Sequence, residues 1–244
     1  MSWPWGNPSS LPPTLGSVVL KLAWRVLDPA AGDDLERFVH LPALLKHEDG
    51  TQESVEVGLV GLHIAHKTLS AMTWVWATFE QVDNLPLEPD PPDTSSRYTF
   101  YNPKCSDCPV NTPTDAGVPT QLVRELPIEE VTQEINDAAQ TRLTALNTVL
   151  QFYRLVGAQW PKNPELAASL SLPCIASEHS PVPSGNPQPA LLTNPVLESF
   201  NQKESCMDCH ASASIASGRA ATPGGALFDR PGSADFLFLF THVP

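Results

Sequence analysis

Apolar and polar residues alternate through much of the first 85 residues of the chain, and this period of two is typical of β-strands. The clearest alternation runs over 16–27, and further strands are predicted over 55–66 and 74–82, where aromatic and β-branched residues are frequent. The link over 67–73 is short enough for a hairpin, and 37–45 is expected to form an edge strand. One face of the first strand is wholly apolar and consists of Val18, Leu20, Leu22, Trp24 and Val26.

Proline sets the organisation of the middle of the chain. Nine prolines lie within 86–127 and predict irregular backbone, because proline cannot donate a hydrogen bond to a central strand. A helix is predicted to begin at Pro127, with acidic residues in its first turn, where the helix dipole favours them. Its apolar residues, at helical spacing, are Ile128, Val131 and Ile135. A strand over 148–160 and a proline-rich loop over 173–195 follow.

These elements predict a mainly β protein in three parts. Residues 1–85 form the β-sheet part, and 86–195 form a proline-rich insertion with one helix and one strand. Residues 196–244 complete the domain, with a short helix predicted over 196–203 and an apolar strand or turn over 234–240. No internal repeat is present.

A C-x-x-C-H run at Cys206, Cys209 and His210 is the motif with specific chemistry. Two cysteines at this spacing lie on one side of a helical turn, where their thiols can add to the vinyl groups of a haem, and the next histidine can bind its iron. The alternatives are half of a zinc knuckle, or a disulfide that happens to precede a histidine. One run predicts one covalent haem c, so the expected fold is mainly β with antiparallel sheets enclosing one haem.

Composition limits the classes of binding partner and the cellular compartment that are expected for this chain. The formal net charge of −13 argues against binding to nucleic acid or to an anionic membrane surface, although it suits a basic redox protein partner. No apolar run reaches transmembrane length. Haem c is attached outside the cytoplasm, so a periplasmic or otherwise exported protein is expected. The first residues, MSWPWG, lack the features of a signal peptide, and we expect a mature chain or part of a longer exported protein.

Three further cysteines are present, Cys105, Cys108 and Cys174. A disulfide is the expected state in an oxidising compartment. The spacing leaves open whether Cys105 pairs with Cys108, or whether either of them pairs with Cys174. Together with His179, the three thiols could instead form a Cys3His zinc site.

The iron of a haem c needs a sixth ligand or an open site. His63 shares its predicted strand face with Gly61 and Ala65, and a face of small residues lets a flat macrocycle approach the backbone. His63 is therefore expected to line the far side of the haem, as an iron ligand or as a hydrogen-bond donor. His66, on the other face of the strand, is a second candidate ligand or a core histidine. Met72, in the turn between two strands, would give the histidine–methionine ligation usual for electron carriers.

Lys21 is the other unusual position, because it stands in a strand with apolar neighbours. A lysine there usually extends to solvent at a sheet edge. The functional alternative is a lysine at the haem rim that acts as ligand, proton donor or covalent attachment. The catalytic candidates are thus Lys21 and His63, and the metal-ligand candidates are His210, His63 and His66.

The order of these blocks resembles a known family. The chain carries a Trp-Pro-Trp-Gly start, the strand with Lys21, the segment His63-Ile-Ala-His-Lys-Thr, the segment Trp74-Val-Trp-Ala-Thr-Phe, and a C-terminal C-x-x-C-H. It resembles the β-sheet c-type cytochromes that include the hydroxylamine-oxidising enzyme with a lysine-cross-linked haem and cytochrome c-prime-beta. The haem motif is the specific part of this resemblance, which covers about the first 85 and the last 45 residues.

The resemblance implies two antiparallel sheets that enclose the haem, with His210 as the proximal ligand. It places Lys21 near the haem edge and His63 in the pocket, beside a five-coordinate iron that binds or oxidises nitric oxide or hydroxylamine. The chain departs from the family in its insertion over 86–195 and in offering a histidine where an open pocket is expected.

Two functions therefore compete. The first is a monohaem c-type cytochrome in small-molecule haem redox chemistry or gas binding, with nitric oxide, hydroxylamine or peroxide as ligand, whether or not it is an enzyme. The alternative is a periplasmic electron-transfer cytochrome with a six-coordinate haem and an acidic docking surface. A structural or sensor module, in which the haem cross-links a proline-rich domain, is the third hypothesis.

Overall fold

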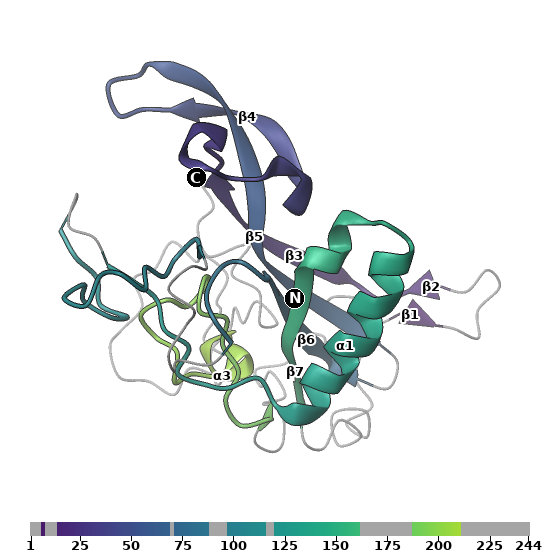
Figure 1. Ribbon diagram of the computed structural model, residues 1–244. Coiled ribbons are helices and arrows are strands. Elements are labelled where there is room, and N and C mark those ends of the chain that lie inside the picture. The colour runs from purple at the N-terminus through teal and green to yellow at the C-terminus, as the bar shows by residue number, and fades with distance from the viewer. Residues whose placement is uncertain are drawn as a thin grey trace, which may run out of the picture.

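An antiparallel sheet forms the centre of the computed structural model, which describes residues 6–7, 14–68, 71–87, 97–115, 120–161 and 187–210 (Figure 1). The strands lie in the order β3 (Val18–Val26), β5 (Gln52–Thr68), β6 (Ala71–Gln81), β7 (Tyr153–Pro161) and β8 (Pro187–Gln188). β4 (His40–Lys46) pairs with β5, and every strand pair of this sheet is antiparallel. The prediction of a mainly β protein is confirmed.

β5 organises the sheet because it is long enough to have different neighbours at its two ends. Its first half pairs with β4, and the two strands project from the rest of the fold as a ribbon (Figure 1). Its second half lies between β3 and β6. The strand predicted over 37–45 is thus β4, which hydrogen-bonds to β5 alone among the described strands. A separate two-stranded ribbon consists of β1 (Gly6–Asn7) and β2 (Thr14–Leu15).

The long helix α1 (Glu130–Ala145) begins three residues after Pro127 and packs beside β7 (Figure 1). Asn136 accepts a hydrogen bond from the Leu155 N–H at 2.7 Å and donates one to the Leu155 carbonyl at 2.8 Å. A polar face of the helix therefore pairs with the outer edge of the strand, which would otherwise be open. Of the apolar residues that predicted this helix, Val131 and Ile135 are exposed, whereas Ile128 is buried just before the helix begins.

Several other predictions differ from the structure in detail. The strand predicted over 148–160 is a 3-10 helix, η3 (Val149–Phe152), followed by β7. The prediction of a helix over 196–203 is wrong, because this segment forms turns. In the first of them, the N–H groups of Leu197 and Glu198 donate hydrogen bonds to the Asn194 carbonyl. β7, which comes from the predicted insertion, lies in the main sheet. The element predicted over 234–240 lies outside the described residues.

The two faces of the sheet are covered differently. Three clusters of buried apolar side chains lie along one face and its ends, formed by Ala65, Trp74, Trp76 and Met207, by Leu27, Phe38 and Val60, and by Ile128, Val156 and Leu192. On the other face, the apolar side of β3 is 37–54% exposed within the described part of the chain. No helix among the described residues is long and apolar enough to cross a membrane.

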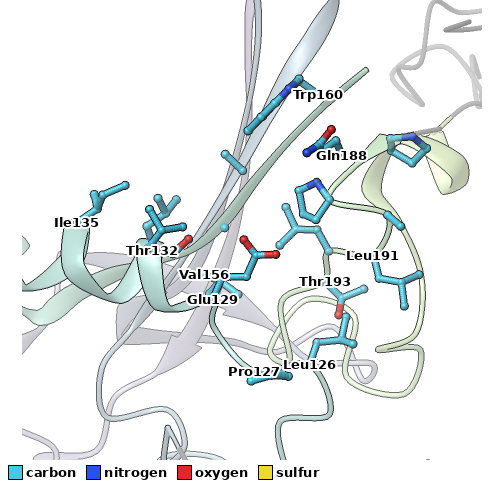
Figure 2. A pocket seen from close by; sticks show the side chains of 18 residues that line it. Leu126, Pro127, Glu129, Thr132, Ile135, Val156, Trp160, Gln188, Leu191 and Thr193 are labelled. Atoms are coloured by element: carbon cyan, nitrogen blue, oxygen red, sulfur yellow. The ribbon is translucent and has the colours of Figure 1, made fainter. Parts of the chain in front are cut away.

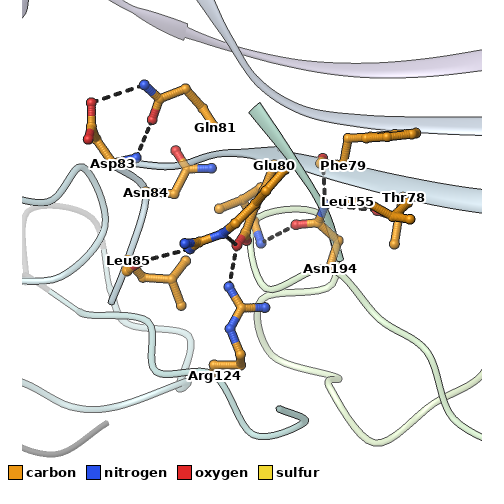
Figure 3. Close-up of polar contacts among 12 residues, drawn as sticks. Thr78, Phe79, Glu80, Gln81, Asp83, Asn84, Leu85, Arg124, Leu155 and Asn194 are labelled. Carbon is orange, nitrogen blue, oxygen red and sulfur yellow. Dashed lines mark hydrogen bonds and ion pairs between the residues drawn. The ribbon is translucent and has the colours of Figure 1, made fainter. Parts of the chain in front are cut away.

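A buried ionic cluster fixes the loops at the far end of β6 (Figure 3). Glu80 is fully buried and accepts hydrogen bonds from Arg124 and, at 2.6 Å, from Arg154 Nε. Arg154 also donates to the Leu85 carbonyl at 3.1 Å. Beside this cluster, Asn194 donates to Thr78 Oγ1 at 2.8 Å and to the Phe79 carbonyl at 2.9 Å. The segment that leads to the C-x-x-C-H motif is thereby held on the sheet.

Candidate functional site

The C-x-x-C-H run forms a short helix, α3 (Cys206–His210), that lies against the covered face of the sheet. Met207 is 2% exposed and packs with Ala65 and Trp76, so the residue between the two cysteines anchors the helix. Cys206 is half-buried, Cys209 is exposed, and neither is in a disulfide. The motif thus presents its second cysteine outward while its centre is fixed to β5 and β6.

Gln159 of β7 holds the first turn of α3. Its side-chain oxygen accepts hydrogen bonds from the Met207 N–H at 2.9 Å and from Ser205 Oγ at 3.1 Å. The first N–H groups of a helix have no partner within the helix, and Gln159 supplies one. On the other side, the Leu192 carbonyl lies 3.3 Å from Cys206 Sγ.

His210 lies against an aromatic side chain of the sheet. The centroid of its ring is 4.5 Å from that of Trp76, and the two planes are tilted by 47°. Trp76 is 4% exposed, and its indole N–H has no hydrogen-bond partner among the described residues. The Trp76 ring therefore limits the orientations that the His210 imidazole can adopt.

Two of the predicted site residues are brought together by the strand register. Lys21 and His63 are direct partners in the β3–β5 pairing, and both project toward the covered face. Glu198, from the turns that precede α3, lies between them. One carboxylate oxygen is 3.6 Å from Lys21 Nζ, and the other is 3.5 Å from His63 Nε2. His66 lies three residues after His63 on the same strand. Because successive side chains of a strand alternate between its two faces, His66 projects from the opposite face, away from α3.

Charge and burial act in opposite directions at Glu198. Burial raises the pKa of its carboxyl group, but His63, Lys21 and a 2.9 Å hydrogen bond from the Asn194 N–H lower it by more, so that the pKa lies below its ordinary value. The carboxylate is therefore ionised at neutral pH. The pKa of the Cys206 thiol is raised to about 12, mainly by burial and further by the charge of Glu198. Lys21 acts on the same pKa in the opposite direction, so Glu198 and Lys21 are within electrostatic reach of the first cysteine of the motif.

The space above Gly61 is filled by protein. A Cβ atom added there would lie 2.9 Å from Val196 Cγ2 and 3.1 Å from Leu197 Cδ1. The small residue thus admits the 194–198 turns close to β5, and the expectation that a macrocycle approaches the backbone at this point is wrong. His63 itself is buried under the same turns.

The structure decides how two of the other cysteines pair, which the sequence left open. Cys105 and Cys108 form a disulfide with each other. This bond removes two thiols from the zinc alternative, and its other two ligands, Cys174 and His179, lie outside the described residues. In the described part of the chain, no three side chains of His, Cys, Asp or Glu gather in a way that could hold a metal ion. Met72, the candidate methionine ligand, belongs to β6 and not to a turn.

A hollow lies apart from the motif, between α1, β7 and residues 187–193 (Figure 2). Its volume is about 870 Å³, and Trp160 lies at one end, with Leu126 and Pro127 at the other. Neither cysteine of the motif nor His210 lines it. Glu129 is its one charged residue, so this hollow offers little polar chemistry.

The donor set of the motif fits a covalently attached haem: two thiols outside any disulfide and an adjacent imidazole that is oriented by a neighbouring ring. Sequence reasoning missed Glu198, Gln159 and the contact of Trp76 with His210. These residues come from a turn and two strands, and only Trp76 had a signal, as part of the aromatic pattern of its strand. No family model, curated protein or solved structure matches this chain.

Proposed function

We propose that this chain is an exported monohaem c-type cytochrome that binds or transforms a small molecule at its haem. The observation that carries the proposal is the C-x-x-C-H helix, whose two cysteines are outside any disulfide and whose histidine is set against Trp76. In this proposal Cys206 and Cys209 form thioethers, and His210 is the proximal ligand. The haem, when bound, supplies the redox-active iron at which nitric oxide, hydroxylamine or peroxide would react.

The surroundings of Cys206 support a thioether at this position. Burial disfavours a charged sulfur and raises the thiol pKa to about 12, whereas a thioether is neutral and can be buried without that penalty. Glu198 and Lys21 both act on the pKa of this thiol, and Glu198 also faces His63. These residues would supply charged and proton-exchanging groups near the first thioether, and this favours small-molecule chemistry over electron transfer alone.

The protein groups then have separate roles. His63 faces Glu198 through Nε2, and this contact favours a role in proton exchange over a role as iron ligand. His66 projects from the other face of β5 and is a weaker candidate ligand than His63. The resemblance to the lysine-cross-linked enzyme would place Lys21 at the haem rim, and its exposed ammonium group leaves it accessible there.

The first test is the mass of the intact chain, isolated from a host that attaches haem c and then denatured. We expect the mass of the polypeptide plus one haem, and loss of that increment in the Cys206→Ser, Cys209→Ser double variant. A mass equal to that of the bare polypeptide would sink the proposal.

An electron-transfer cytochrome is the second candidate, favoured by the net charge of −13 and its fit to a basic partner. The optical spectrum of the ferric protein separates the two functions. A high-spin spectrum that changes on addition of nitric oxide indicates an open iron. A low-spin spectrum that does not respond indicates two protein ligands and supports electron transfer.

A further inference from the structure

The hollow between α1, β7 and residues 187–193 gathers large apolar side chains that the fold leaves exposed (Figure 2). Its lining includes Val131 and Ile135 of α1, Trp160 of β7, and Leu191, which are 57%, 53%, 42% and 44% exposed, respectively. Single exposed apolar residues are common on protein surfaces, but a contiguous group of them marks an interaction site or a ligand groove. The apolar spacing that predicted α1 thus serves this hollow as well as the core.

The outer edge of β7 forms one wall of the hollow. Leu155 bonds through its backbone to Asn136 of α1, and Trp160 pairs with Gln188 of β8. Between these two positions, no strand in the described part of the chain pairs with this edge. Residues 155–160 span roughly 17 Å at the rise of an extended strand, so the hollow is elongated along β7. Its volume of about 870 Å³ lies in the range of sites for small molecules.

Glu129 gives this apolar space a single charge. Its carboxylate points into the space between α1 and residues 187–193 (Figure 2). The side chain does not cap the helix, and no lysine, arginine or histidine is among the described residues that line the hollow. An acidic residue is also favourable at the start of a helix, where the dipole is positive. Glu130 shares that position in the first turn of α1 but does not line the hollow.

We propose that this hollow binds an elongated apolar molecule with a positively charged head group, of the class of long-chain amines and quaternary ammonium compounds. The head group lies at Glu129, near Pro127, and the apolar chain follows β7 toward Trp160. Burial of the chain is favourable because it removes apolar surface of both the ligand and the protein from water. The carboxylate then selects the charge of the head group. An anionic molecule would meet a like charge here, and the net charge of −13 adds to that repulsion.

This inference is separate from the proposed haem function. None of Cys206, Cys209 and His210 lines the hollow. The binding that it predicts needs no chemistry at an iron, so a chain without covalent haem would refute the proposed function and leave this inference to its own test.

The test is calorimetric titration of the full chain with three probes that share one apolar chain and differ in charge: decyltrimethylammonium, decanol and decanoate. All are used at low salt and below the concentrations at which they form micelles. We expect saturable binding at one site, with decyltrimethylammonium bound about fivefold more tightly than decanol, as expected of one partly exposed ion pair. Decanoate should bind more weakly than decanol. Raising the ionic strength to about 1 M, where the Debye length is about 3 Å, should remove most of these differences.

Two substitutions separate the head group from the chain. Glu129→Gln should bring decyltrimethylammonium to the affinity of decanol, whereas Glu130→Gln, the matched control that also loses a charge at the helix N-terminus, should keep the fivefold difference. Val131→Ser should weaken all three probes by a similar factor of about three, because it removes apolar surface but no charge. Equal urea midpoints for the natural chain and Glu129→Gln would show that the fold is intact.

Several results would overturn the inference. They are the absence of saturable binding by any probe, an affinity order that does not depend on charge, and a preference for the cation that survives in Glu129→Gln. Sedimentation of the chain with and without decyltrimethylammonium adds one more. If the probe binds only by splitting a dimer, the hollow is an interface between two copies of the chain and not a ligand site.

Discussion

Replacing Gly61 by alanine should disturb both the stability of the fold and the geometry of the site. The added Cβ would lie 2.9 Å from Val196 Cγ2 and 3.1 Å from Leu197 Cδ1, closer than carbon atoms normally approach. Valine is stiff at χ1, so relief requires a shift of the 194–198 turns, which carry Glu198. The substitution therefore acts on the carboxylate that faces His63, without changing a polar residue.

The size of the effect follows from two opposing terms. Extra methyl groups in a packed region cost about 1–3 kcal/mol, while replacing glycine by alanine restricts the unfolded chain and returns about 0.4–1 kcal/mol. We expect the free energy of unfolding to fall by about 1–2 kcal/mol, measured as a shift of the urea midpoint at constant slope. We also expect a smaller loss of stability below pH 4.5 in the variant, because displacing Glu198 from Lys21 and His63 removes part of the stability that its lowered pKa contributes.

Gly58 of the same strand provides the matched control. A Cβ atom at Gly58 would lie 2.9 Å from side-chain atoms of Leu27 and Phe38, in a different apolar cluster. Gly58→Ala should therefore cost a similar free energy while the pH dependence of unfolding stays that of the natural chain. A loss of stability in Gly61→Ala with an unchanged pH dependence would refute the link between this packing contact and Glu198. A Gly61→Ala chain as stable as the natural one would refute the packing argument itself.

Three further outcomes are expected. Glu80→Gln should lower the free energy of unfolding by about 3–5 kcal/mol, because two buried arginines lose the carboxylate that they share. Glu53→Gln, an exposed control, should change it by less than about 0.5 kcal/mol in the same urea titration. Tyr153→Phe should cost about 1–3 kcal/mol, because the hydroxyl accepts from one backbone N–H and donates to one carbonyl, and an unchanged urea midpoint would contradict this. Folding lowers the pKa values of Glu198 and Asp83 below their ordinary values of 4.5 and 3.8, so the stability they contribute is complete above that range and is lost as the pH falls through the folded pKa values. Unfolding free energies measured from pH 7 down to pH 2 should decrease below that range, and a flat profile would refute the assignment.

The local pattern of the sequence determined the type of most elements. Alternation in three N-terminal segments predicted β3, β5 and β6, because a period of two is a property of the extended backbone itself. The C-x-x-C-H spacing likewise named the candidate haem residues, since that chemistry needs only neighbours along one helical turn. Pro127 marked the start of α1 to within three residues.

The tertiary structure decided which of these residues meet. Periodicity identifies the two faces of β3 and β5 but not what covers them, so Lys21 and His63 could be listed without their partner, Glu198. The same limit applies to α1, whose polar residue Asn136 pairs with the edge of β7 while Val131 and Ile135 remain exposed. The backbone N–H and carbonyl groups at a strand edge need hydrogen-bond partners, so a polar face of the helix packs there. The residue that carries these groups, Leu155, lies outside the helix, so the periodicity of the helix does not reveal it.

The prediction of a helix over 196–203 failed for the same kind of reason. Those residues are held by Asn194, which bonds to β6 rather than continuing a helix, and by Glu198, which faces two strands. Local propensity is worth a few tenths of a kcal/mol per residue, and several side-chain contacts to the sheet outweigh it. The sequence by itself determined the candidate donor set, Cys206, Cys209 and His210, and the main strands of the sheet. The register of β3 against β5 and the docking of the turns before α3 brought Lys21, Glu198 and His63 together, because contacts between distant segments exist only once the sheet has formed.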